Sequence, residues 1–339
     1  MDMNNMSTEN MNETRRFSVN KTFFVIAGIA FFIVPWIFPR LGNYAPGAAI
    51  LAGACCAFAF GNPFREVTAK AVSPLLGAAI VGMGFGMNLP AVLKAGASGF
   101  FYTVLGISAG LGIGILLGKK LKLGRDTMML ISVGTSICGG SAIAAAAPVL
   151  KAKAHDIALA TATVFILNGV ALLVFPPLGH WLGFNETQFG TWAALAIHDT
   201  SSVVGASMQY GETALEVGTT VKLARALWIV PVALFIAFLV RKDNQGGEGK
   251  TKVKVPWFIP GFLLAAMFVT WVPGVRDAGL FLQTLSKHLM VLTLFLIGAN
   301  LSVDKIRELG IRPFLHGVIL WVILATAWGA AIHFQLVRV

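Results

Sequence analysis

The strongest constraint on the fold is a series of apolar segments that recur along nearly the whole chain. Each is about 20 residues long, which at about 1.5 Å per residue lets a helix cross the hydrocarbon core of a bilayer. About eleven such segments are expected, near residues 22–38, 44–60, 71–89, 97–118, 126–150, 156–182, 190–209, 214–240, 256–274, 281–301 and 313–335. The sequence therefore predicts an all-α polytopic membrane protein.

The composition agrees with this prediction and excludes an ordinary soluble domain. Hydrophobic residues make up 56% of the 339 residues and charged residues only 12%, whereas soluble domains have a charged share of about 25%. The net charge of +11 comes from basic residues between apolar segments, which is typical of topology signals and not of a nucleic-acid surface. We therefore expect the lipid bilayer, and no nucleic acid, as a partner.

The basic residues also predict on which side of the membrane each loop lies. Basic loops follow the fourth, eighth and tenth segments, and they share a side with Arg15 and Arg16 if every segment spans. Cytoplasmic loops are rich in Lys and Arg, so the N-terminus is predicted to be cytoplasmic. Lys151 and Lys153 would then lie outside. That anomaly disappears if segments 126–150 and 190–209 are re-entrant hairpins, and the sequence leaves both arrangements open.

The chain divides into four predicted parts. Residues 1–20 are polar and are expected to form a disordered cytoplasmic tail, and the charged, glycine-rich residues 241–255 to form a cytoplasmic linker. Residues 21–240 hold the first membrane part with two polar interruptions, and residues 256–339 the last three spans. No other part is long enough for a soluble domain, so the function is predicted to lie within the membrane.

The first polar interruption lies in the fifth apolar segment, where residues 134–143 read GTSICGGSAI. Non-helical backbone at membrane depth is tolerated only where it is buried in protein or lines a wet cavity. The alternative is that small residues simply let helices pack closely. We predict a helix break whose substrate-binding residues are Thr135, Ser136, Cys138, Gly139, Gly140 and Ser141.

The second interruption, in segment 190–209, contains an acidic residue near the middle of an apolar segment. A charge there is costly, so Asp199 is a functional candidate unless it forms a purely structural salt bridge. We predict that Asp199 and the adjacent His198 couple transport to a proton or cation. The neighbouring hydroxyls predicted to bind substrate are Thr200, Ser201 and Ser202.

Two basic residues in the eighth segment lie on one face of a helix. Lys222 and Arg225 are three positions apart, the spacing of neighbours on a helix surface. They either extend toward the membrane interface or pair with Glu212 and Glu216, or they supply positive charge to an anion site. Asn168 in the sixth segment is interpreted as an interhelical hydrogen-bonding residue.

A short internal repeat indicates a transporter. Residues 83–89 read MGFGMNL and residues 295–301 read FLIGANL, and the predicted topology gives the two copies opposite orientations. Inverted repeats are typical of secondary transporters. Asn88 and Asn300 are predicted to lie at helix ends, as C-caps or as polar groups near the translocation path.

Several of these motifs together resemble one known family. SICGGSAI at 136–143 with Pro148, HDTSSVV at 198–204, TTVKLAR at 219–225 with Pro231, and the segment 295–301 are similar to the YeiH-like family of bacterial inner-membrane proteins, which are described as sulfate exporters. The resemblance covers nearly the whole chain after the tail. It implies an inner-membrane transporter of sulfate or a related anion.

A more distant likeness is to the bile-acid:sodium symporter group, in which two discontinuous helices cross at the substrate site. The shared features are the Gly-x-Asn-Leu helix end, one span, and then a broken Cys-Gly-Gly-Ser-Ala segment. This chain differs because its second polar break precedes the second Gly-x-Asn-Leu copy. The family's sodium ligands are therefore not transferred to this sequence.

The sequence thus predicts a secondary transporter of a small anion such as sulfate, sulfite or a sulfonate, coupled to a proton or cation gradient, with export as one option for its direction. The alternatives are a sodium-coupled symporter of small organic acids, an anion channel, and an intramembrane enzyme with Cys138 or Ser141 as nucleophile and His198 as base. We expect no enzyme activity, cofactor or metal. A homodimer is left open.

Overall fold

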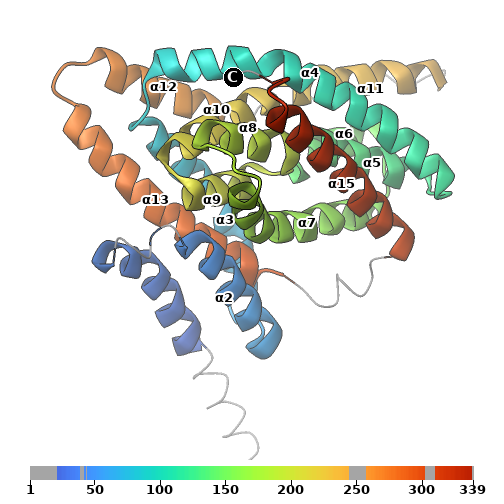
Figure 1. The fold of residues 1–339 in the computed structure, drawn as a ribbon. Helices are drawn as coiled ribbons and strands as arrows, with labels where there is room; N and C mark the ends of the chain where they lie inside the picture. The colour runs from blue at the N-terminus through green and yellow to red at the C-terminus, as the bar shows by residue number, and fades with distance from the viewer. Residues whose placement is uncertain (1–20, 39–41, 43, 244–256, 302–309, 338–339) are drawn as a thin grey trace, which may run out of the picture.

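The computed structural model describes residues 21–38, 42, 44–243, 257–301 and 310–337. The predicted tail, 1–20, and the part of the predicted linker from 244 onward lie outside these ranges. Within them the secondary structure is helical, and the helices follow the predicted apolar segments (Figure 1). Six described helices are long and apolar enough to cross a membrane, and others are shorter but apolar. The chain is therefore a polytopic helical membrane protein.

The first helix runs over Lys21–Ile37. The helices after it are α2 (Ala45–Phe60), α3 (Arg65–Gly84), α4 (Leu89–Lys120), α5 (Arg125–Ser136), α6 (Gly140–Leu150), α7 (Ala154–Trp181), α8 (Glu186–Ala196), α9 (Thr200–Tyr210), α10 (Glu212–Ala226), α11 (Ile229–Asp243), α12 (Phe258–Trp271), α13 (Arg276–Ala299) and α15 (Ile311–His333).

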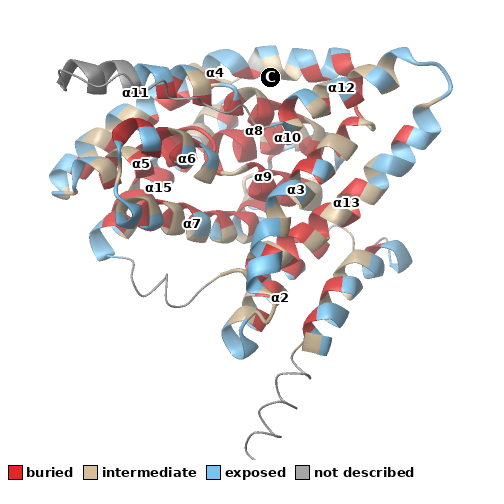
Figure 2. Cartoon of the chain, turned by 180° about the vertical axis from the view of Figure 1, so that it is seen from behind, coloured by how far each residue is buried: buried red, intermediate tan, exposed pale blue. Residues whose placement is uncertain are grey.

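Burial follows the pattern of a protein in lipid, with polar side chains inside and apolar side chains outside. Lys222 and His198 are 0% exposed, whereas Leu116 is 69% and Trp181 79% exposed. Figure 2 shows α8, α9 and α10 mostly buried, and longer helices such as α4 and α13 with exposed outer faces. A hydrocarbon environment favours this distribution, because it solvates Leu and Trp surfaces but not charged groups.

The described helices pack as two bundles. Bundle A comprises the Lys21–Ile37 helix with α2, α3, α12 and α13, and bundle B comprises α4 to α11 with α15. In bundle A, a Cβ at Gly53 would lie 2.1 Å from the carbonyl oxygen of Phe295, and one at Gly298 would lie 2.2 Å from that of Ile50. Glycine is required at both positions because the α2 and α13 backbones approach so closely. The last three predicted spans divide between the bundles, since α12 and α13 join bundle A and α15 joins bundle B.

The packing is repeated within the chain. Two sets of helices make the same contacts among themselves. The helices of the first set, α2, α3, α4, α5–α6 and α7, correspond in this order to α12, α13, α15, α8–α9 and α10–α11. Thus α2 packs on α13 as α12 does on α3, α4 packs on α5 as α15 does on α8, and α7 contacts α9 as α11 contacts α6. In chain order the second set begins at its broken helix. The second break therefore precedes the second Gly-x-Asn-Leu segment in sequence and still occupies the equivalent place in space.

The two repeated asparagines lie at helix ends in different roles. Asn300 is the C-cap of α13, and its Oδ1 accepts hydrogen bonds from Thr68 Oγ1 (2.9 Å) and Asn62 Nδ2 (3.2 Å). Asn88 instead begins α4 as its N-cap, with its side chain accepting from the backbone N–H of Ala91 (3.4 Å). The C-cap interpretation of Asn88 is corrected here, because Pro90 in the first turn is suited to starting a helix.

Candidate functional site at two helix breaks

Both polar interruptions are helix breaks of equal length. Residues 137–139 separate α5 from α6, and residues 197–199 separate α8 from α9. An isoleucine is the C-cap of the first half-helix in each case, and Gly139 and Asp199 are the N-caps of the second halves. The backbone of Gly139 has φ +67°, a conformation that side-chain-bearing residues rarely adopt. Glycine is therefore needed for the first break, whereas the second uses an N-capping carboxylate.

The ammonium group of Lys222 connects the ends of both first half-helices. Its Nζ donates hydrogen bonds to the carbonyl oxygens of Ile197 (2.6 Å), Ile137 (3.3 Å) and Ala194 (3.5 Å). These carbonyls lie at helix C-termini, which carry partial negative charge and lack intrahelical donors. All three N–H donors of Lys222 are thus directed at backbone.

Arg225 makes a parallel set of contacts. Its guanidinium donates to the carbonyl oxygen of Ser136 through Nε (3.1 Å) and Nη2, and through Nη1 to those of Leu195 (2.5 Å) and Ala194 (3.2 Å). The side chain is 1% exposed. Lys222 and Arg225 therefore compensate the negative ends of α5 and α8 and hold the two breaks in register.

This geometry corrects one interpretation of the two cations. They do not extend to the membrane interface, because both are fully buried. Nor does either form an ion pair with a carboxylate in the described part of the chain, and Glu212 pairs instead with Lys287. Their hydrogen bonds lead to carbonyl oxygens, so any effect on an anion acts through charge and through positioning of the breaks.

The N-terminal ends of the second half-helices meet beside Asp199. Asp199 Oδ1 accepts from the backbone N–H of Ser202 (2.8 Å), and Oδ2 accepts from Ser201 Oγ (2.9 Å). A Cβ at Gly139 would lie 3.3 Å from Asp199 Cβ, so the two breaks are in contact. The start of α6 has no side-chain cap, and its free N–H groups lie next to the carboxylate-capped start of α9.

Asn168 is the residue that sequence reasoning placed outside the candidate site. From α7, its Oδ1 accepts hydrogen bonds from the backbone N–H groups of His198 and Asp199, each at 3.2 Å. The His198 ring nitrogen Nδ1 lies at the same distance from this oxygen. In the sequence, Asn168 is a single amide side chain in an apolar segment. Such a residue indicates a polar contact but does not identify the partner.

Several buried polar atoms around the breaks have no hydrogen-bond partner within the described ranges. Burying such groups without a partner is costly, so their concentration is typical of a site that binds a polar ligand. They are Thr135 Oγ1, Ser136 Oγ, Asn168 Nδ2, His198 Nε2, Thr219 Oγ1 and Thr220 Oγ1.

The other predicted site residues differ in accessibility. Ser141 is exposed and Gly140 is partly exposed, whereas Cys138 and the hydroxyls of residues 200–202 are buried. No hydrogen bond among the described residues links Cys138 or Ser141 to His198. Within the same residues, no three His, Cys, Asp or Glu side chains are grouped so that they could hold a metal ion.

Comparison with known proteins places the chain in a family. The family model described as conserved hypothetical protein 698 matches residues 21–317. A UPF0324 membrane protein of Bdellovibrio bacteriovorus is 48% identical over 325 residues, which cover 96% of this chain and 97% of that protein. UPF0324 membrane proteins of Bacteroides thetaiotaomicron and Geobacter sulfurreducens are 43% identical (93% of this chain, 96% of the relative) and 46% identical (88% and 91%). No solved structure matches. This chain therefore belongs to the UPF0324 family of membrane proteins.

Proposed function

We propose that this protein is a secondary transporter that carries a small anion across the bacterial inner membrane, with its binding site at the two contacting helix breaks. The substrate class that best fits the site is a small oxyanion such as sulfate, sulfite or a sulfonate. The resemblance to YeiH-like exporters supports the same class. The N-terminus is cytoplasmic in this proposal, as the basic loops predict.

The observation that carries the proposal is a difference between the half-helix ends at the breaks: the C-terminal ends are bound by basic side chains, whereas one N-terminal end has no side-chain cap. Lys222 and Arg225 occupy the C-terminal carbonyls of α5 and α8, whereas the N-terminus of α6 has no side-chain cap. Free N–H groups at a helix N-terminus bind anions well. Lys222 and Arg225 place two basic side chains against the single carboxylate of Asp199 at the breaks, a balance that favours an anionic ligand.

The hydroxyls and backbone N–H groups near the start of α6 then contact the substrate. Ser141 is the exposed member of this group, and Gly140 beside it has no side chain to block approach. Thr135 and Ser136 contribute the unpaired hydroxyls on the other side of the break. Half-helix N-termini of broken membrane helices bind anionic substrate groups in known transporters, which supports this proposal.

Asp199 is the coupling residue in this mechanism. Its carboxylate lies beside the proposed anion site and is partly exposed, so a proton or a cation bound there would offset its repulsion of the substrate. His198 contributes less, because its ring is fully buried and in contact with Asn168. Binding of the anion and of the coupling ion would then be mutually favourable, as linkage requires.

The test is transport by the purified protein in proteoliposomes. We expect sulfate or sulfite uptake to follow an imposed proton or cation gradient in the wild type. Asp199→Asn should retain substrate binding and lose the dependence on the gradient, because the neutral amide still caps α9 but cannot exchange a proton or attract a cation. Gradient-driven transport by Asp199→Asn at the wild-type rate would contradict the coupling role.

The alternative within the same class is a sodium-coupled symporter of small organic acids. The distant likeness to the bile-acid:sodium symporter group favours it. The equivalent packing of the two broken helices in the internal repeat is compatible with it. A screen of thermal stabilisation with sulfate, sulfite, a sulfonate and small carboxylates, each with and without sodium, separates the two. Stabilisation by carboxylates only when sodium is present would favour the symporter.

A further inference from the structure

Three backbone carbonyl oxygens from the two broken helices lie around one atom. They belong to Ile137 at the end of α5 and to Ala194 and Ile197 at the end of α8, and they lie 3.3, 3.5 and 2.6 Å from Lys222 Nζ. The first oxygen comes from one break and the other two come from the opposite break. The carbonyl site, defined by these three oxygens, therefore exists only in the folded protein.

The chemistry of the carbonyl site favours a small cation. Carbonyl oxygens at half-helix C-termini carry partial negative charge and lack intrahelical donors. In transporters with broken helices such ends coordinate a coupling cation, and in channels carbonyl oxygens replace the hydration shell of K⁺. A carbonyl has no proton to donate, so the occupant has to be a cation or a hydrogen-bond donor.

Lys222 fills the carbonyl site from a neighbouring helix. The residue belongs to α10 and is 0% exposed. Its ammonium is a compact charge on a flexible stem, and its three N–H donors match the three oxygens in number. Arg225, one turn later on α10, binds the adjacent carbonyls of Ser136 and Leu195. The occupant of the site is therefore part of the chain and cannot exchange with ions in solution.

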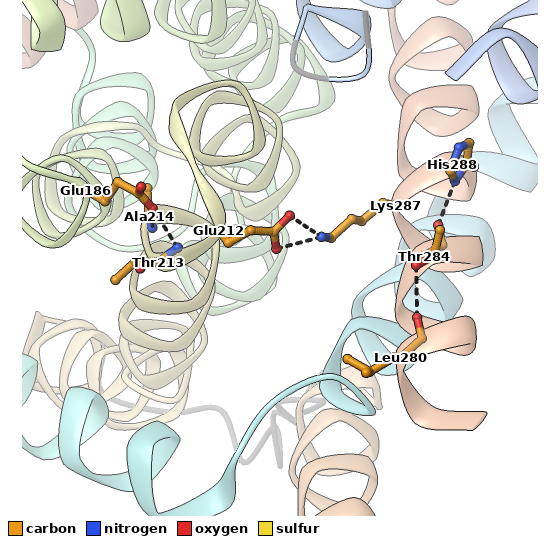
Figure 3. A network of polar contacts seen from close by, with 8 residues as sticks. All are labelled: Glu186, Glu212, Thr213, Ala214, Leu280, Thr284, Lys287 and His288. Atoms are coloured by element: carbon orange, nitrogen blue, oxygen red, sulfur yellow. Dashed lines mark hydrogen bonds and ion pairs between the residues drawn. The ribbon is translucent and has the colours of Figure 1, made fainter. Parts of the chain in front are cut away.

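Lys287 shows a different way of pairing a lysine in the same protein. Its Nζ lies 2.5 and 2.6 Å from the two carboxylate oxygens of Glu212, whose side chain is 76% exposed (Figure 3). A carboxylate neutralises the charge of a lysine, whereas carbonyl groups are dipoles without net charge. Lys222 is thus held by its surroundings as an alkali cation is held by carbonyl oxygens, and not as a member of an ion pair.

This occupancy bears on the identity of the coupling ion. An alkali cation gives up its hydration shell only where several oxygens replace it. At the breaks, the C-terminal carbonyls bind Lys222 and Arg225, and the two oxygens of Asp199 accept hydrogen bonds from Ser202 and Ser201. A proton needs only one lone pair of the Asp199 carboxylate, so it remains compatible with these contacts.

We propose that the carbonyl site is a cation site in which the Lys222 ammonium takes the place of a coupling alkali cation, and that anion transport is therefore coupled to a proton and not to sodium. The coupling part rests on the proposed transport function. The cation site itself does not, because it is defined by contacts within the folded protein.

Thermal unfolding of the purified full-length protein in detergent tests the cation site. Lys222→Ala removes the ammonium and most of the stem, and it should lower the unfolding temperature because the carbonyls stay buried without a donor. Sodium, potassium or propylammonium chloride should each raise the unfolding temperature of this variant by a few degrees. Choline chloride should not, because choline is bulky and has no N–H group, and it controls for ionic strength.

Lys287→Ala is the matched control, because the same substitution there leaves one exposed carboxylate instead of the carbonyl site. This variant and the wild type should respond to the three cations no more than to choline. Stabilisation of the wild type by sodium beyond choline would overturn the proposal, whether or not Lys222→Ala folds. A folded Lys222→Ala protein that responds to none of the cations, or to propylammonium alone, would also overturn the replacement of an alkali cation.

Proteoliposomes with sulfate as the probe anion test the coupling part. Uptake by the wild type should follow an imposed pH gradient and keep its rate when choline replaces sodium on both sides. Uptake that requires sodium would overturn proton coupling while supporting the transporter itself. Absence of uptake under every gradient would contradict the proposed function, and the unfolding experiment would still decide whether Lys222 fills a cation site.

Discussion

At the scale of single residues, the most consequential side chains are two buried cations that do not contact a carboxylate in the described part of the chain. Lys222 and Arg225 compensate carbonyl oxygens at the ends of α5 and α8. Removing one partner of a buried polar contact costs more than the contact itself contributes, because the other partner stays buried and unpaired. These residues therefore stabilise the breaks as well as setting their charge.

Arg225→Gln tests this stabilising role. Glutamine cannot reach both half-helices, so carbonyls of Ser136 and Leu195 lose their donors and the free energy of unfolding should fall by roughly 2–4 kcal/mol. The measurement is reversible unfolding in mixed micelles. Arg276→Gln, at an exposed position, is the matched control and should have little effect. A loss of anion binding by Arg225→Gln with unchanged stability would instead indicate direct ligand contact.

At the scale of elements, the two helix breaks have the same length but depend on different residue types. The first break relies on the backbone of Gly139 at φ +67°, and the second relies on Asp199 as an N-cap. An N-capping carboxylate satisfies the first turn of α9, whereas glycine leaves the first turn of α6 without a side-chain partner. This difference is why the proposed anion site lies at α6.

Gly139→Ala and Gly140→Ala form a matched pair for this element. A Cβ at Gly139 is strained by its φ and lies 3.3 Å from Asp199 Cβ, whereas a Cβ at Gly140 makes only an ordinary contact with Phe165 at 3.5 Å. Gly139→Ala should therefore destabilise the protein by about 1–3 kcal/mol and weaken substrate binding. Gly140→Ala should leave the free energy of unfolding nearly unchanged, and thermal unfolding of both variants checks this difference. Equal behaviour of the two variants would refute a special backbone role for Gly139.

At the scale of the whole molecule, the two bundles are internally close-packed and meet through fewer contacts. Bundle A contains the glycine-mediated approach of α2 and α13, and bundle B contains both breaks. Rigid-body motion of one packed unit against another is a common basis of alternating access. The boundary between the bundles is thus where we expect movement during transport.

Cross-linking across that boundary tests the motion. In a Cys55→Ala background, which removes the exposed native thiol, cysteines at positions 212 and 287 joined by a short bismaleimide should block transport. The control pair, cysteines at 186 and 213, lies within bundle B, where Glu186 contacts Thr213, and should leave transport intact. Full transport activity after complete 212–287 cross-linking would exclude relative motion at this boundary.

The sequence alone determined the helical membrane class, the approximate limits of the apolar segments, and the positions of both breaks. These properties depend on local composition, because apolar length sets spanning helices and glycine or hydroxyl clusters interrupt them. The α4 start was wrong by several residues, since Asn88 and Pro90 begin that helix before the expected segment at 97.

Tertiary structure alone decided which groups meet at the breaks. That Lys222 joins Ile137 to Ile197, that Asn168 holds His198 and Asp199, and that Lys287 pairs with Glu212 depend on contacts between residues far apart in the chain. A sequence pattern shows which face of a helix a residue occupies but not which helix that face contacts. The second broken helix also takes its place in the repeat through packing, because its order along the chain is shifted.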